Sequence, residues 1–222
     1  MLKKVFRAMA CCLTAAMILA MGSGTSQAEM VYSASELSKG QVVEFGGDKL
    51  VTLSGFEDVL PYHWYVIDIQ GSRVMLMWAE SIYGARKFHE NSSTNSWARC
   101  SLRAWLNDEF YNEGFSEEEK SIIVKSNVET AGTVTQDFVY LLSKKEVEPL
   151  LKEAGISKVF YDKEGKAVSW WLRSPGVMAS DRAANVDPDG SLNGSGVAHG
   201  GFGHYVADAI AVRPVLWIDL KS

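Results

Sequence analysis

A short run of oxygen-bearing side chains is the clearest place in the sequence for chemistry. Asn185, Asp187 and Asp189 occupy alternate positions before Gly190. Ca²⁺ takes about six to eight oxygen ligands, and this spacing is typical of calcium loops. Position twelve of the pattern is Gly196, where a calcium loop needs a bidentate glutamate. We therefore expect a β-hairpin with an Asp-Gly turn and no cofactor, with Ca²⁺ bound by the three oxygen-bearing side chains as the alternative.

Two histidines in a glycine-rich segment form a second candidate. His199 and His204 are five residues apart, and Asp208 follows them. Imidazole and carboxylate groups bind metals, but this spacing is not that of two ligands on one face of a zinc-binding helix. We expect a surface loop, with a metal-dependent site shared with the Asp187 hairpin as the alternative.

Two arginines in apolar surroundings form a third candidate. Arg173 and Arg213 each lie in an apolar strand pattern close to a proline. A lone buried charge is costly, so an arginine in such a place usually pairs with a carboxylate. We expect structural ion pairs, and recognition of an anionic ligand by the guanidinium group is the alternative.

One cysteine and two aromatic residues complete the candidates. Cys100 precedes a predicted helix and follows Arg99, which would lower a thiol pKa, but no spacing identifies a histidine partner. We expect a buried, unreactive thiol, with a thiol-based enzyme as the alternative. Phe88 and Trp97 lie in polar loop sequence, so we expect them to be exposed and able to stack on sugar rings.

Strand patterns precede and follow a helical region. Residues 64–69 and 73–78 are apolar on both faces around a glycine-containing turn, which predicts a hairpin inside a sheet. Further strand patterns cover residues 41–46, 137–142, 169–174, 183–186, 192–197 and 209–218, the last interrupted at Pro214. Strands, then helices, then strands, without βαβ alternation, predict an α+β fold with a mainly antiparallel sheet braced by two or three short helices.

Three helices are predicted between the strands. Residues 101–111 place apolar side chains at helical spacing. A capping box at Ser116 predicts a helix over 117–126. A second capping box at Ser143 predicts a helix that ends near Gly155 and is kinked or shortened by Pro149.

The first 28 residues have the pattern of a signal peptide. Lys3, Lys4 and Arg7 precede an apolar run over 8–21, and small residues at 26 and 28 fit cleavage before Glu29. We expect an exported protein, secreted, periplasmic or held at the cell surface, with no membrane span after cleavage. Residues 29–40 would then be a short leader and 41–222 a single domain.

The composition describes an acidic globular domain. The chain has 222 residues, 47% of them hydrophobic and 11% aromatic, which excludes a disordered chain. Its 22 basic and 27 acidic residues become 19 and 27 without residues 1–28, which hold three basic and no acidic ones, for a net charge of −8. This balance disfavours nucleic acid and anionic membranes as partners.

Five ordered motifs carry a family resemblance over about residues 41–219. They are Trp64-x-Val66-Ile67-Asp68, Trp97-x-x-Cys100-Ser101-Leu102-Arg103-x-Trp105-Leu106-Asn107-x-x-Phe110, Asp137-x-Val139-x-Leu141-Leu142-Ser143-x-x-Glu146, Trp170-Trp171-Leu172-Arg173-Ser174-Pro175-Gly176 and Val212-Arg213-Pro214. In this order they resemble a large family of bacterial extracytoplasmic domains of unknown function. That family's fold is similar to the C-type-lectin-like fold of sulfatase-modifying enzymes. The resemblance implies paired terminal strands, two bracing helices and a ligand surface built from long loops.

Two functions remain open on these grounds. The first is an exported, non-catalytic binding module for an unknown extracellular ligand, such as a glycan, an envelope component or a protein. The second is a metal-dependent or thiol-based extracytoplasmic enzyme related to sulfatase-modifying factors, although those enzymes typically use paired cysteines and only Cys100 follows the signal peptide. Binding would use the loops at 84–98 and 176–208. The candidate ligand-binding residues are Phe88, Trp97, Arg173, Asp187, Asp189, Asn193, His199, His204 and Arg213.

Overall fold

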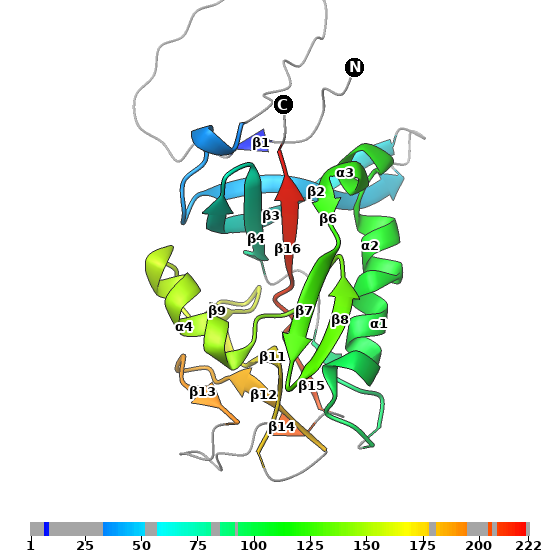
Figure 1. Ribbon diagram of the computed structural model, residues 1–222, viewed down its shortest axis with the longest axis vertical. Coiled ribbons are helices and arrows are strands. Elements are labelled where there is room, and N and C mark those ends of the chain that lie inside the picture. Colours follow the sequence, from blue (N-terminus) through cyan, green and yellow to red (C-terminus); the bar gives the residue numbers. More distant parts are fainter. Residues whose placement is uncertain are drawn as a thin grey trace, which may run out of the picture.

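A six-stranded antiparallel sheet is the largest element of the fold (Figure 1). The computed structural model describes residues 7–8, 33–51, 57–80, 85–91, 93–177, 181–194, 204–205 and 208–220. The strand order in the sheet is β1–β2–β3–β4–β16–β6. These strands are β1 (Arg7–Ala8), β2 (Val42–Val51), β3 (Glu57–Gln70), β4 (Arg73–Trp78), β6 (Ile123–Val124) and β16 (Val215–Asp219).

The β3–β4 hairpin lies inside this sheet, as its apolar pattern predicted. Gly71 adopts a φ of 63° in the turn. Trp64 and Trp78 are direct partners across the hairpin, with ring centroids 5.0 Å apart. Both rings are buried, as are Ile67 and Met77 on the opposite face. Other elements therefore cover both faces of the hairpin, which explains why neither face is polar in sequence.

The position of β16 differs from the one that the resemblance implied. A C-type-lectin-like fold would pair the terminal strands, whereas β16 pairs with β4 on one side and β6 on the other. Pro214 interrupts the last strand pattern as expected. The part before it, β15 (Ala209–Ile210), pairs with β5 (Arg86–Lys87) outside the main sheet. The last strand of the fold is thus an interior strand.

Short helices follow the strand-rich first part. α1 (Ser101–Asn107) and α2 (Glu109–Gly114) cover the predicted helix, with a break at Asp108. α3 (Glu117–Ile122) begins at its predicted capping box. It ends earlier than predicted because Ile123 leaves the helix and pairs with Ile218 as the first residue of β6.

The α4 helix (Lys144–Glu153) begins at the second predicted capping box and ends at Ala154. The helix continues beyond Pro149, whose side chain is exposed. Pro149 therefore does not end the helix, as a shortening at this position would require. Gly155 follows with a φ of 67°, a conformation that favours glycine after a helix. α4 packs against β3 and β11.

A second, smaller sheet lies at the other end of the molecule (Figure 1). It consists of β11 (Trp170–Pro175), β12 (Arg182–Val186), β13 (Leu192–Asn193) and β14 (His204–Tyr205). β12 pairs with each of the other three strands. The predicted hairpin around Asp187 is therefore confirmed as β12 and β13.

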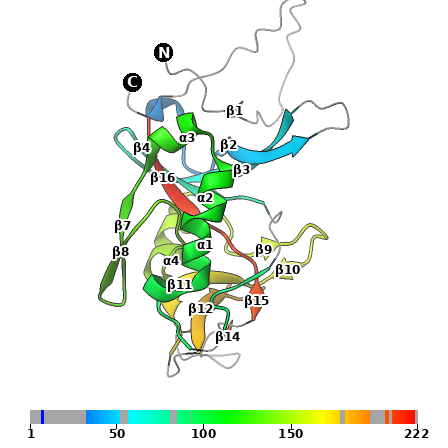
Figure 2. The same cartoon turned by 90° about the vertical axis from the view of Figure 1, so that its right-hand side faces the viewer.

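Two ribbons project from the body on opposite sides in Figure 2. One is β7 (Ser126–Thr130) with β8 (Thr133–Asp137), and the other is β9 (Phe160–Tyr161) with β10 (Ala167–Val168). The strand predicted over 137–142 is wrong in extent. β8 ends at Asp137, and beyond it Tyr140 forms a single bridge with Val215.

The predicted fold class is confirmed: the protein is α+β, mainly antiparallel, with short helices. Within the described residues, no helix is long and apolar enough to cross a bilayer.

Candidate functional site

Arg173 forms the ion pair that its apolar setting predicted. The side chain is buried, and both terminal nitrogens contact Glu146 at the start of α4, with Nη2 2.6 Å from Oε1. Nη1 also donates to the Leu141 carbonyl at 2.7 Å, and Nε donates to Thr130 Oγ1 at 3.0 Å. The structural ion pair expected for Arg173 is therefore confirmed, and each nitrogen of its guanidinium has a partner.

Arg213 is buried without such a carboxylate, so the ion pair predicted for it is wrong. It is 2% exposed. Nε donates to the Trp78 carbonyl at 3.3 Å, whereas Nη1 is buried and has no hydrogen-bond partner. The guanidinium carbon lies 4.6 Å from the ring centroid of Phe160 and 5.0 Å from that of Trp170.

Burial lowers the pKa of Arg213 to about 9, although nearby Tyr65 acts in the opposite direction. The shift reflects the cost of placing a cation where water cannot solvate it. The two aromatic rings offset part of that cost through cation–π attraction. An anion beside Nη1 would supply the remaining hydrogen bond and the countercharge.

A polar group of three side chains on and beside the main sheet was not predicted from the sequence. Glu44 of β2 lies directly opposite His63 of β3, with Glu44 Oε1 3.6 Å from His63 Nε2. On the other side, Nδ1 of His63 contacts Oε1 of Glu80, which follows β4. The remaining oxygen of each glutamate, Oε2, is buried and accepts no hydrogen bond.

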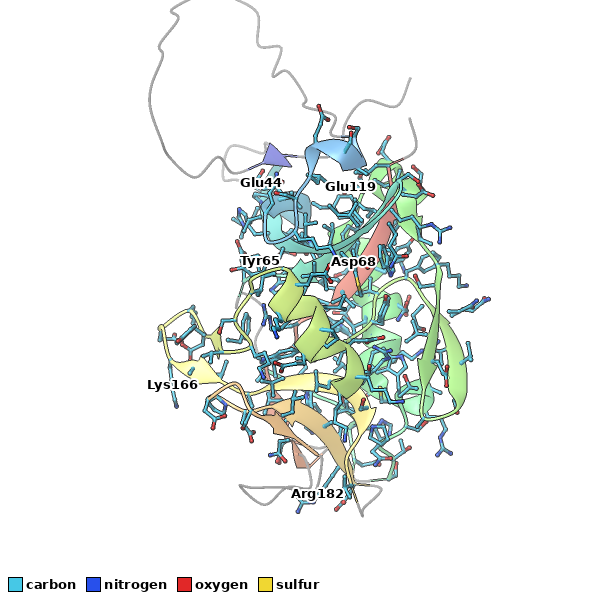
Figure 3. All side chains as sticks on the ribbon, turned by 60° about the vertical axis from the view of Figure 1, so that its left-hand side comes forward. Glu44, Tyr65, Asp68, Glu119, Lys166 and Arg182 are labelled. Carbon is cyan, nitrogen blue, oxygen red and sulfur yellow. The ribbon has the colours of Figure 1, made fainter. Side chains whose placement is uncertain are left out.

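The sheet register gives the strand positions around this group. Tyr65, Met77 and Val215 are successive partners across β3, β4 and β16, so they form one row. His63 lies two residues before Tyr65 on β3, and Arg213 lies two residues before Val215, ahead of the first residue of β16. Figure 3 shows Glu44 and Tyr65 one above the other, with the ribbon that carries Lys166 below them.

Backbone contacts support this placement. Ala79 N donates to the His63 carbonyl at 3.0 Å, and Trp78 N donates to the Pro214 carbonyl at 2.9 Å. Tyr65, which influences the Arg213 charge, lies on β3 two residues from His63.

The Asp187 hairpin has the geometry of the predicted turn. Gly190, at a φ of 83°, donates its N–H to the Asp187 carbonyl at 2.8 Å. The Asp187 carboxylate accepts the side-chain amides of Asn185 at 2.7 Å and Asn193 at 3.4 Å. Asp189 is exposed and accepts Ser191 N at 2.9 Å. These hydrogen bonds are formed within the hairpin itself, each to one oxygen of a carboxylate.

The residues of the proposed histidine site are not brought together by what the structure describes. His199 lies outside the described residues, and Asp208 is exposed just before β15. His204 pairs with Ala183 near one end of β12, whereas Asp187 follows the other end, about 13 Å along the strand. Among the described side chains, no three His, Cys, Asp or Glu residues are placed to hold a metal ion.

Phe88 and Trp97 are buried, so the prediction that they are exposed is wrong. Phe88 packs on Trp171, with centroids 5.5 Å apart. Trp97 lies in the 3-10 helix η2 (Trp97–Arg99) and donates Nε1 to Asp137 at 2.9 Å. The polar residues around them remain at the surface while the two rings turn into the core, a distinction that loop composition does not reveal.

The two loops expected to form a ligand surface do meet. β5, in the first loop region, pairs with β15, which follows the second. Asn95 Nδ2 also donates to the Arg182 carbonyl at 2.9 Å. In the described part of the two segments, the contact between Asn95 and Arg182 joins them at the end of the molecule that carries the smaller sheet.

Cys100 is a buried helix cap. Its Sγ accepts Arg103 N at 3.4 Å and donates to the Trp97 carbonyl at 3.4 Å. Burial raises the pKa of the thiol to about 12, and the smaller effects of Arg103 do not offset it. The thiol is thus protonated at neutral pH, as expected for an unreactive cysteine.

Sequence reasoning missed Glu44, His63 and Glu80. The available signal was polar residues in otherwise apolar strand sequence, with His63 between Tyr62 and Trp64. The partnership of the three residues depends on the register of β2, β3 and β4, which the sequence pattern does not define.

The fold is an α+β domain of mainly antiparallel sheets that buries Arg213 among aromatic rings. Residues 72–220 match the family described as "Domain of unknown function (DUF6273)", and the chain belongs to this family. The matched region includes Cys100, Arg173 and Arg213, whereas Glu44 and His63 precede it. No curated protein and no solved structure matches the chain.

Proposed function

We propose that the protein is an exported, non-catalytic domain that binds an anionic ligand through Arg213. The observation that carries the proposal is the buried Nη1 of Arg213, which lacks a hydrogen-bond partner. Guanidinium groups bind carboxylate and phosphate through parallel hydrogen bonds, which are strong when both groups are charged. The aromatic rings of Phe160 and Trp170 would exclude water around such a pair.

The chemistry of the ligand follows from the site and the compartment. A carboxylate of an acidic glycan or of an envelope component would suit a cationic site in a domain that acts outside the cytoplasm. We propose no nucleic-acid partner, because the charge balance of the exported chain is acidic.

The protonated Cys100 thiol and the hydrogen-bonded Asp187 carboxylate support a binding function rather than the enzymatic alternative. Cys100 is protonated at neutral pH and is a helix cap, so it is poorly suited to nucleophilic attack. The Asp187 carboxylate is occupied by amide donors from its own hairpin. We propose no cofactor, with Ca²⁺ at Asn185, Asp187 and Asp189 as the minor alternative.

The test is a binding series with Arg213→Met, which keeps an apolar side chain of similar length. Calorimetric titration with acetate, N-acetylalanine and inorganic phosphate should give binding to the wild type, and the variant should lose at least about tenfold in affinity. Arg73→Met is the matched control, because Arg73 is exposed on the same sheet. Equal affinity of wild type and Arg213→Met, or absence of binding by all three anions, would overturn the proposal.

Stability measurements separate a ligand-binding arginine from a structural one. The free energy of unfolding of Arg213→Met should equal that of wild type or exceed it by up to about 2 kcal/mol, because the substitution removes an unpaired buried charge. Arg173→Met should lose about 3 kcal/mol, because it leaves Glu146 without its partner. A large loss of stability in Arg213→Met would identify Arg213 as structural, with Arg213→Lys then separating charge from hydrogen-bond geometry in the binding series.

A further inference from the structure

The β9–β10 ribbon carries the aromatic ring that covers Arg213, and we propose that this ribbon is a flap whose opening admits the ligand, with Phe160 as the gate. Arg213 is 2% exposed, so an anion in solution reaches Nη1 only when one of the groups around the guanidinium moves away. The inference rests on the proposed function, because it describes how the same site is reached, but its test needs no ligand.

The groups that contact the guanidinium differ in how firmly they are held. The Trp78 carbonyl, which accepts Nε at 3.3 Å, belongs to β4 inside the six-stranded sheet. Trp170 begins β11, which pairs with β12 in the smaller sheet. Phe160 lies in β9, and in the described part of the chain β9 and β10 pair only with each other. Phe160 can therefore leave Arg213 without any strand of the two larger sheets being broken.

Phe160 is also the point at which the ribbon is attached to the body. Among residues 160–168, all of which the structure describes, only Phe160 is buried. Tyr161, the next residue, is 55% exposed. The turn of the ribbon is closed by its own hydrogen bond, from Gly165 N to the Asp162 carbonyl at 2.9 Å. Figure 2 shows the ribbon projecting from the body, so it can swing as one unit once the Phe160 ring is released.

The first leg of the ribbon is fixed at Lys158 and Val159. The Lys158 carbonyl accepts Trp170 Nε1 at 2.9 Å, and Lys158 Nζ lies 2.6 Å from Glu148 Oε2 on α4. A Cβ atom added at Gly190 would lie 3.2 Å from Val159 Cγ2, so the turn after Asp187 packs closely on this leg. The chain is therefore held immediately before Phe160.

The second leg is fixed at Ser169. Its carbonyl accepts Ala211 N at 3.0 Å, and Trp171 N donates to the Ala211 carbonyl at 3.0 Å. Bending is thus confined to the backbone just after Val159 and just before Ser169. Local opening of a segment with few buried contacts is a common low-energy motion of folded proteins.

Phenylglyoxal, which modifies arginine side chains that solvent reaches, tests the gate on the full chain. In the wild type, Arg213 should react more slowly than Arg73, whose side chain is 55% exposed. Phe160→Ala removes the buried ring and should speed the reaction at Arg213 at least about tenfold. Tyr161→Ala is the matched control, because it removes an exposed ring from the same strand, and it should keep the wild-type rate. Peptide-level mass spectrometry measures both arginines.

A hinge variant separates motion of the ribbon from loss of the ring. Val159→Gly frees the backbone at the bend while Phe160 stays in place, and it should speed the modification of Arg213 at least about twofold. Val134→Gly makes the same change at an exposed valine of the β7–β8 ribbon and should have no effect at Arg213.

Cys100 reports global unfolding in the same samples. Its alkylation rate and the Arg213 modification rate are each divided by the rate at that residue in urea. Arg213 should be less protected than Cys100 in every variant, because the flap opens without unfolding the core. Equal protection of the two residues would overturn the flap, as would a wild-type Arg213 as reactive as Arg73, or unchanged rates in Phe160→Ala or Val159→Gly.

The anion titrations are read separately. If Phe160→Ala and Val159→Gly expose Arg213 but no anion binds, the flap stands as a gate to Arg213 and the proposed function is wrong. If anions bind through Arg213 but neither variant changes its modification, the proposed function stands and the flap is wrong.

Discussion

Asp137 shows how one buried side chain joins several elements. It is fully buried, yet it accepts hydrogen bonds from Trp97 Nε1 at 2.9 Å, Arg103 Nε at 2.7 Å and Thr135 Oγ1 at 2.7 Å. Arg103 also supplies the countercharge. Charged hydrogen bonds from three directions offset the loss of hydration. The carboxylate thereby fixes η2 and α1 against the base of the β7–β8 ribbon.

The burial of Cys100, next to this region, leads to a testable prediction. Iodoacetamide should modify Cys100 in the folded protein at least about 100-fold more slowly than in urea, because only the thiolate reacts and burial keeps the thiol protonated. Peptide-level mass spectrometry over time measures both rates, with the unfolded protein as the control. Similar rates in the two states would show that the thiol is accessible and ionised.

The two arginines show what residue patterns can and cannot predict. Both lie in apolar strand sequence near a proline, and the sequence predicted an ion pair for each. Arg173 has its partner because the capping box at Ser143 places Glu146 in the first turn of α4, beside β11. Arg213 has aromatic rings instead. Which of the two has a carboxylate depends on tertiary contacts between distant segments, and no local pattern contains that information.

The start of α4 concentrates several interactions on Glu146. Burial alone would raise the pKa of Glu146, but the hydrogen bond and charge of Arg173, with hydrogen bonds from Ser143, hold it below its ordinary value of 4.5. Because the folded pKa lies below the unfolded one, the ionised carboxylate stabilises the fold above pH 4.5. That contribution is lost as the pH falls through the folded pKa.

Glu146→Gln should therefore reduce the loss in the free energy of unfolding as the pH becomes acidic. Urea unfolding between about pH 6 and 3 should show a steep fall in the free energy of unfolding for wild type and a shallower one for the variant. Glu164→Gln, an exposed glutamate in the turn between β9 and β10, should keep the wild-type slope. Parallel profiles for wild type and Glu146→Gln would contradict the role given to the Arg173 pair.

Elements were predicted better at their beginnings than at their ends. Both capping boxes correctly placed the starts of α3 and α4, because a cap is a local arrangement of side chain and backbone. The ends depended on distant partners, such as Ile218, which pairs with Ile123 and stops α3. The polar group at the candidate site escaped prediction for the same reason, since Glu44 meets His63 only through the register of β2 and β3.

On the scale of the whole molecule, residues 33–40 belong to the packed structure. The 3-10 helix η1 (Ala34–Glu36) buries Ala34, and Leu37 is buried after it. Lys39 Nζ lies 2.8 Å from both Asp68 on β3 and Glu153 on α4. The segment that composition suggested as a leader thus connects the main sheet with α4.

This packing sharpens the expected cleavage position. The protein recovered outside the cytoplasm should begin at Glu29, because cleavage there removes only β1 from the described fold and leaves η1 and Lys39 in place. N-terminal sequencing and intact mass measure the position. A first residue beyond Ala34, or an intact Met1, would contradict it.

The interior position of β16 governs when the fold can form. A growing chain that ends before Val215 has β4 and β6 but lacks the strand that joins them. The pairing partners of β16 are far earlier in the chain, and such distant contacts form slowly. The main sheet therefore closes only after synthesis reaches Asp219. A chain shortened before Val215 would therefore leave β4 and β6 with exposed edges that could pair with other chains.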